Sequence, residues 1–121
     1  MVTTTQLPSK IIAGERTAIQ TLLAKLLATY PDDILQVILF GSKARGDFTA
    51  DSDTDMLVLV RHETWELRDN IWKMAARIEL NHDNVVFNIQ VIGEERWKEM
   101  NSMQFGMCRN VEADGIVLFR Q

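Results

Sequence analysis

Two short apolar runs, separated by a loop rich in Gly, Ser and Asp, lie in the middle of the chain. The first run is residues 34–40 (ILQVILF), and the second is residues 56–60 (MLVLV). Each has the length and the aliphatic and β-branched content of a buried strand, and the segment between them is dense in turn-forming residues. This pattern predicts a strand, a loop and a second strand, with the chemistry in the loop and just beyond it.

Two aspartates, Asp53 and Asp55, come directly before the second run, where the second strand is expected to start. In an extended backbone they point to one face of the sheet and Thr54 points to the other. Two neighbouring carboxylates repel each other unless cations lie between them, and such a pair suits Mg²⁺ bound together with a substrate phosphate. The alternative is a turn in which Ser52 and Asp53 bond to local N–H groups. We favour metal binding because of the turn that precedes the pair.

That turn is Gly41-Ser42, at the end of the first run. A glycine lets the backbone approach a ligand closely, and a serine hydroxyl with nearby N–H groups can bind phosphate oxygens. Lys43 and Arg45 follow, and two roles for them stay open. They either add positive charge beside the phosphates or form ion pairs with Asp47 or Asp51.

The segments 41–46 (GSKARG) and 52–55 (SDTD) together resemble the G-S-x-A-R-G…S-D-x-D signature of the minimal nucleotidyltransferases of the DNA polymerase beta superfamily. The resemblance implies a nucleotidyltransferase fold, a nucleoside triphosphate such as ATP bound through Mg²⁺, and transfer of a nucleotidyl group to an acceptor hydroxyl. It makes Asp53 and Asp55 the catalytic metal ligands. The expected nucleotide-binding residues are Gly41, Ser42, Lys43 and Arg45.

The resemblance also implies a partner protein. Members this small are often encoded beside a HEPN-domain protein and act as the antitoxin of the pair, some by modifying the partner and some by binding alone. Transfer of AMP to a hydroxyl of such a partner is therefore the leading expectation.

One position departs from the family pattern. Active members usually carry a third carboxylate on a later strand, and residues 84–92 (NVVFNIQVI) put Asn88 at that place. The alternation of this strand turns Asn88 toward the site, as a third metal ligand. An amide is a neutral and poorer ligand than a carboxylate and cannot act as a general base. We therefore expect nucleotide binding, with catalysis weakened or replaced by binding alone.

Hydrophobic periodicity predicts the secondary structure of the rest of the chain. The expected elements are a helix over residues 10–30 capped by Ser9, a helix from Thr64 to about residue 81, a strand over residues 85–92, a short polar helix opening at residues 93–97, a helical stretch over residues 103–111, and a last strand over residues 116–119. This order predicts one mixed α/β domain over residues 1–121, with a small mixed sheet, helices packed largely on one face, and residues 1–8 flexible.

Composition narrows the choice of partners and compartment. The net charge is −4, with acids and bases mixed along the chain, so we expect no duplex nucleic acid as partner. The single cysteine, Cys108, allows no internal disulfide, and its apolar neighbours predict a small buried residue. Without a signal-peptide pattern or a membrane-length apolar run, a cytoplasmic protein is expected. The oligomeric state stays open, and a homo-oligomer is compatible with the sequence.

Overall fold

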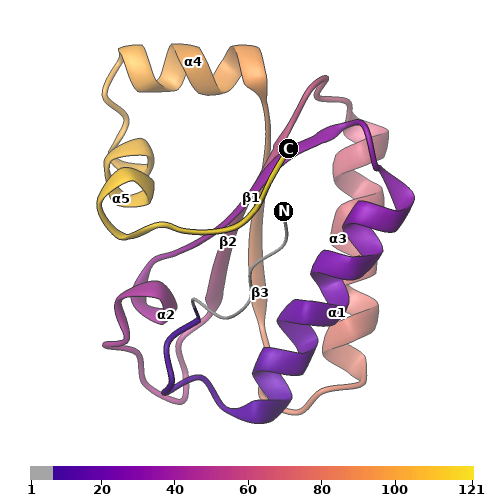
Figure 1. Cartoon of the computed structure of the whole chain (residues 1–121), viewed down its shortest axis with the longest axis vertical. Helices are drawn as coiled ribbons and strands as arrows, with labels where there is room; N and C mark the ends of the chain where they lie inside the picture. Colours follow the sequence, from indigo (N-terminus) through magenta and orange to yellow (C-terminus); the bar gives the residue numbers. More distant parts are fainter. Residues whose placement is uncertain (1–6) are drawn as a thin grey trace.

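A computed structural model describes residues 7–121 and contains a four-stranded mixed sheet with helices on both of its faces (Figure 1). The elements follow in the order α1 (Ala13–Thr29), β1 (Ile34–Phe40), α2 (Ser42–Arg45), β2 (Thr54–Val60), α3 (Trp65–Leu80), β3 (Phe87–Gly93), α4 (Glu94–Ser102), α5 (Gly106–Asp114) and β4 (Ile116–Arg120). The mixed α/β class predicted from the sequence is confirmed.

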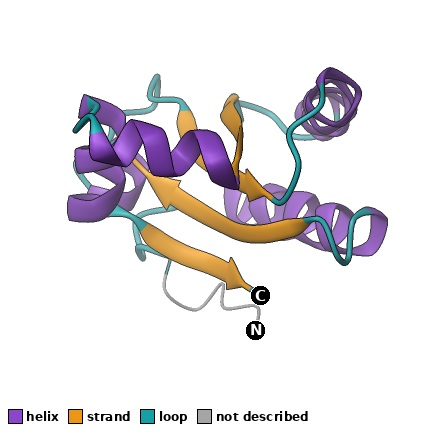
Figure 2. Cartoon of the chain, turned by 90° about the horizontal axis from the view of Figure 1, so that it is seen from above, coloured by secondary structure: helices purple, strands orange, loops and turns teal. Residues whose placement is uncertain are grey.

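The strand order across the sheet is β3-β2-β1-β4. β1 pairs antiparallel with β2 and with β4, and β2 pairs parallel with β3. The parallel pair needs a crossover, which α3 supplies between β2 and β3. β4 is an outer strand and ends close to the C-terminus (Figure 2). The three predicted strands therefore share one sheet, and the predicted last strand completes it.

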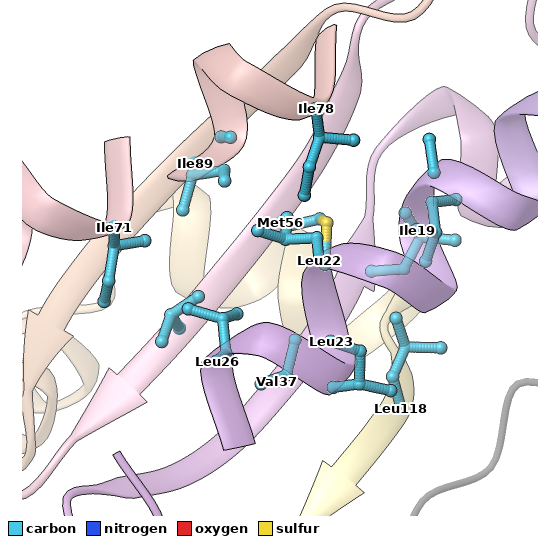
Figure 3. Close-up of a cluster of buried hydrophobic side chains, with 14 of the residues drawn as sticks. Ile19, Leu22, Leu23, Leu26, Val37, Met56, Ile71, Ile78, Ile89 and Leu118 are labelled. Atoms are coloured by element: carbon cyan, nitrogen blue, oxygen red, sulfur yellow. The ribbon is translucent and has the colours of Figure 1, made fainter. Parts of the chain in front are cut away.

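The main core lies between the sheet and the two long helices α1 and α3 (Figure 3). From α1 it receives an apolar stripe at helical spacing. Four of these side chains are at most 1% exposed, namely Ile19, Leu22, Leu23 and Leu26. They meet the alternate residues of the strands that point to this side, such as Val37, Met56 and Ile89. This burial is the dominant favourable contribution to folding.

A second, smaller core lies on the opposite face of the sheet. Its buried residues are Ile38, Phe40, Leu57, Ile92 and Val111, and residues of α4 and α5 pack against them. Thus the two long helices share one face as predicted, and the two nine-residue helices cover part of the other (Figure 1). Cys108 on α5 is buried as predicted, and this burial raises the pKa of its thiol, which keeps it protonated.

The beginning of the chain differs from the prediction. The first helix begins at Ala13, and its N-cap is Ile12 rather than Ser9. Before it, Ile11 N–H donates to the Pro8 carbonyl at 3.1 Å in a turn that carries Leu7 and Ile11 into the core. Residues 1–6 of the segment predicted to be flexible lie outside the described residues. Leu7, also part of that segment, is 6% exposed and packs into the core.

The third strand begins two residues later than predicted. Asn84 has a φ of 62°, in the left-handed region, so the chain turns there and pairs regularly only from Phe87. Val86 lies before the strand, yet its carbonyl already accepts a hydrogen bond from Thr54 N–H at 2.8 Å.

In the part of the chain that the structure covers, no helix has the length and apolar content needed to cross a membrane.

A core substitution should measure the contribution of the α1 stripe. Leu22 is fully buried against the sheet, so Leu22→Ala should lower the free energy of unfolding by roughly 2–5 kcal/mol through lost burial and a residual cavity. Leu80→Ala is the matched control, because Leu80 is 86% exposed and its truncation should change stability by about 0.5 kcal/mol or less. Urea unfolding followed by circular dichroism measures both. Equal losses would contradict this location of the core.

Candidate active site

The turn after β1 brings the backbone against the carboxylate of Asp55. Gly41 has a φ of +74°, a conformation that L side chains rarely adopt, and a Cβ added there would overlap the Asp55 carboxylate. The β1–β2 register explains the contact, since Phe40 and Asp55 are Cα partners across the antiparallel pair. Gly41 is thus required both by its backbone conformation and by the lack of space.

Ser42 opens α2, a helix of four residues within the segment predicted as a loop. The Gly41 carbonyl accepts the N–H of Ala44 and of Arg45, each at 3.1 Å, and Gly46 closes the turn with a φ of +85°. Glycines with positive φ therefore bracket the helix, and the G-x₄-G spacing is the signal that could have indicated it. The half-buried Ser42 directly follows the glycine that contacts Asp55.

Asp53 and Asp55 lie where the sequence predicted, just before and at the start of β2. Thr54 between them is 1% exposed and points to the side of α1, whereas Leu57, two residues after Asp55, belongs to the core on the opposite face. The alternation of the strand places both aspartates on that opposite face. Asp53 is exposed and Asp55 is half-buried, so both carboxylates are accessible.

Asn88 lies directly beside Asp55. The two residues are Cα partners in the parallel β2–β3 pair, and Asn88 Nδ2 donates to Asp55 Oδ1 at 2.9 Å. The prediction that Asn88 faces the aspartates is thereby confirmed in its geometry. A half-turn of the amide would present its oxygen instead, because the two ends of an amide have nearly the same shape.

The donor set at this point is two carboxylates and one amide. Mg²⁺ is typically held by one or two carboxylates together with substrate phosphates and water, so these residues fit a magnesium ion that a nucleotide brings with it. Across residues 7–121, no three His, Cys, Asp or Glu side chains gather in a way that could hold a metal ion.

Lys43 takes neither of the two roles predicted for it, charge beside the phosphates or an ion pair with Asp47 or Asp51. It is 4% exposed, and its Nζ lies 3.0 Å from Glu15 Oε1 and 4.1 Å from the centre of the Phe48 ring. The amine is therefore buried against α1, away from the face that carries the aspartates, and it pairs with neither Asp47 nor Asp51. The sequence could not identify the partner, because Glu15 lies 28 residues earlier.

Arg45 follows the ion-pair alternative in part. Its Nε donates to Asp47 Oδ2 at 3.1 Å, as predicted, and its Nη1 donates to Asp114 Oδ2 at 3.2 Å. The hydrogen bond with Asp47, followed by that with Asp114, raises the pKa of the guanidinium. Asp51 is not the partner. Because Asp114 is the last residue of α5, Arg45 links the end of α2 to the helices on the aspartate face.

Sequence reasoning missed Glu15 altogether. Its carboxylate accepts from Thr54 Oγ1 at 2.7 Å and pairs with Lys43, although it is 4% exposed. The available signal was its position, four residues before Ile19 on the buried stripe of α1, where a charged residue requires a partner.

A cavity of about 350 Å³ opens beside Asn88 at the outer edge of β3. Its lining combines side chains of α3 with those of the strand, namely Trp72, Ala75, Glu79, Phe87, Asn88, Ile89 and Gln90. Trp72 Nε1 donates to the Ile89 carbonyl at 3.1 Å and so covers part of this edge. One of its lining residues, Asn88, also donates to Asp55.

Two curated proteins are similar to this chain in sequence. Both are from Methanocaldococcus jannaschii and carry the name "Putative protein adenylyltransferase". One is 33% identical over 106 residues, which cover 88% of this chain and 99% of the relative. The other is 43% identical over 56 residues, which cover 46% of this chain and 57% of that relative.

Solved structures share the fold. A Sulfolobus solfataricus protein described as a "putative nucleotidyltransferase" aligns over 93% of this chain and 92% of its own, with a TM-score of 0.51 and 20% identity. A toxin-antitoxin structure with AMP-PNP aligns over 83% of this chain and 72% of its own, with a TM-score of 0.53 and 22% identity. A mutant of the toxin-antitoxin MntA-HpeT aligns over 82% and 71%, with a TM-score of 0.52 and 21% identity.

The family model "Polymerase beta, Nucleotidyltransferase" matches residues 22–121, which include the Gly41-Ser42 turn, both aspartates and Asn88. The match extends over most of the chain, and it agrees with the fold and with the motif that the resemblance first rested on. This protein belongs to the polymerase beta nucleotidyltransferase family.

Proposed function

We propose that this nucleotidyltransferase transfers AMP from ATP to a hydroxyl of a partner protein and requires Mg²⁺ to do so. The observation that carries the proposal is the contact between the Gly41 backbone and the Asp55 carboxylate. It brings the backbone of a residue without a side chain against one carboxylate of the aspartate pair, as transfer from a metal-bound triphosphate requires. Adenylate as the group and protein as the acceptor are supported by the names of the two Methanocaldococcus relatives.

The residues then take distinct roles. Asp53 and Asp55 would hold Mg²⁺, which would supply positive charge to the triphosphate while the acceptor hydroxyl displaces pyrophosphate from the α-phosphorus. Ser42 and the backbone of Gly41 bind the outer phosphates. Asn88 holds the Asp55 carboxylate in position by donating from its amide nitrogen. After a half-turn of the amide, its oxygen would instead be a weak third metal ligand. Lys43 and Arg45 support the turn through Glu15, Asp47 and Asp114.

A second candidate is an antitoxin that binds nucleotide and partner with little or no turnover. The substitution at position 88 favours it, because an amide cannot accept the proton of the attacking hydroxyl. The toxin-antitoxin structures with the same fold support a partner protein for either candidate. We propose a HEPN-domain protein as that partner, and the cytoplasm as the compartment.

Nucleotide affinity should depend on Mg²⁺ and on the aspartate pair together. In calorimetric titrations with ATP, the native protein should bind more tightly with Mg²⁺ than without it, and the variant Asp53→Asn with Asp55→Asn should lose that difference, because amides bind the ion poorly. The matched control is Asp32→Asn with Asp33→Asn, two exposed aspartates in the turn before β1. Equal binding by native protein and site variant, with and without Mg²⁺, would make the pair structural.

The contact at Gly41 gives a second expectation. Gly41→Ala forces a Cβ into the space of the Asp55 carboxylate and imposes a backbone conformation (φ +74°, ψ −157°) that is essentially confined to glycine and costs roughly 1–3 kcal/mol for an L residue. It should weaken ATP-Mg²⁺ binding and lower stability. Gly14→Ala is the control, because nothing lies within 4 Å of the added atom and alanine favours the helix. Native affinity in Gly41→Ala would show that the turn does not hold the nucleotide.

A carboxylate at position 88 should increase turnover. If a third acid normally takes the acceptor's proton, Asn88→Asp should raise the rate of labelled adenylate transfer to a co-purified partner by about 10²–10⁴, with a smaller change in nucleotide affinity. Gln90→Glu is the control, since it adds the same charge two residues further along the same strand.

Two outcomes would contradict this reading of position 88. If the native protein is already fast and Asn88→Asp changes nothing, another acid, such as Asp83, must supply the third carboxylate. If both forms are inert and neither binds nucleotide, the enzymatic proposal fails and the partner-binding candidate replaces it.

A further inference from the structure

The buried carboxylate of Glu15 contacts both halves of the nucleotide site from the side of the long helices. It accepts a hydrogen bond from Thr54 Oγ1 at 2.7 Å, and Lys43 Nζ lies 3.0 Å from each of its oxygens. All three residues are at most 4% exposed. The three side chains, Glu15, Lys43 and Thr54, are called the Glu15 cluster below.

Each contact leads directly to a site residue. Lys43 follows Ser42 in α2, so fixing its side chain fixes the turn that begins at Gly41. Thr54 lies between Asp53 and Asp55. The hydrogen bond from its hydroxyl therefore fixes the backbone from which both aspartates point to the opposite face. Through one carboxylate, α1 therefore holds both the phosphate-binding turn and the aspartate pair.

Stability alone does not account for such a cluster. Taking two charges out of water is costly, and well-packed apolar residues in place of a buried ion pair are often as stabilising or more so. Position 15 also belongs to the buried stripe of α1, where an aliphatic residue would pack if positions 43 and 54 were apolar too. A geometric role explains why charged residues occupy these positions.

We propose that Glu15 is a positioning residue for nucleotide binding, holding the Gly41-Ser42 turn in register with Asp53 and Asp55 through Lys43 and Thr54. The inference rests on the proposed function for its ligand, ATP with Mg²⁺. The geometric part, that Glu15 orders residues 41–46 and 53–55, concerns the ligand-free protein and can be measured separately.

The primary test is Glu15→Gln, which keeps the shape and an oxygen for Thr54 but removes the charge that pairs with Lys43. In the ligand-free protein, amide hydrogen exchange at residues 41–46 should accelerate about tenfold or more relative to native, with exchange in α3 unchanged at temperatures well below the unfolding midpoint. The dissociation constant for ATP-Mg²⁺, measured by calorimetry, should rise about tenfold or more.

A control must separate positioning from general destabilisation. Leu23→Ala removes a side chain of the same helix that is 1% exposed, and it should lower the unfolding midpoint while leaving exchange at residues 41–46 and the ATP-Mg²⁺ dissociation constant near native. If Glu15→Gln fails to fold, a triple variant replaces it, with Glu15→Leu, Lys43→Met and Thr54→Val. This variant exchanges the whole cluster for apolar residues of similar size, and it should fold but bind the nucleotide as weakly as expected for Glu15→Gln.

Native exchange at residues 41–46 and a native dissociation constant in a folded cluster variant would overturn the inference. Equal effects of Leu23→Ala and Glu15→Gln on both quantities would also overturn it, because the role would then be general stability. If the native protein itself does not bind ATP-Mg²⁺, the proposed function and the nucleotide-binding role of Glu15 fail together. The exchange result then decides alone whether Glu15 orders the turn.

Discussion

The close approach of the Gly41 backbone to the Asp55 carboxylate is the constraint on which the site depends. It exists because β1 and β2 pair antiparallel with Phe40 opposite Asp55, so the turn leaving one strand meets the second residue of the other. No side chain can stand between them. A ligand that contacts the turn is therefore also within reach of the carboxylates, and this is what transfer from a metal-bound triphosphate needs.

The two faces of the sheet have different roles, since one forms the main core and the other carries the candidate site. On the side of α1 and α3, alternate strand residues form the main core, and the Glu15 cluster provides the buried polar residues found there among residues 7–121. On the other side, Asp53, Asp55 and Asn88 stand at one end of the strands, beyond the smaller core under α4 and α5. The strict alternation of β2 lets Thr54 serve the first face while both aspartates serve the second.

The sequence predicted the parts of this arrangement that are local. Strand-length runs, the period of the long helices and the Asp-x-Asp alternation each depend on a few neighbouring residues, and the structure agrees with them. The position of Asn88 beside Asp55 followed from alternation and from the family resemblance.

Contacts between distant segments were not predictable in the same way. The partner of Lys43 lies 28 residues away, and the second partner of Arg45 lies 69 residues away. The first helix begins later than its pattern suggests, because the turn at Pro8 first carries Leu7 and Ile11 into the core. These features depend on how elements pack, which residue periodicity does not encode.

The proposed site holds a metal-bound nucleotide between the Gly41-Ser42 turn and the aspartate pair. Paramagnetic broadening of amide NMR signals tests it directly, with Mn²⁺ in place of Mg²⁺ and ATP present. Signals of residues 41–46, 53–55 and Asn88 should broaden first, and Asp53→Asn with Asp55→Asn should abolish this broadening. Broadening that begins at other acidic positions, such as Asp32 and Asp33, and leaves residues 41–55 sharp would contradict the claim.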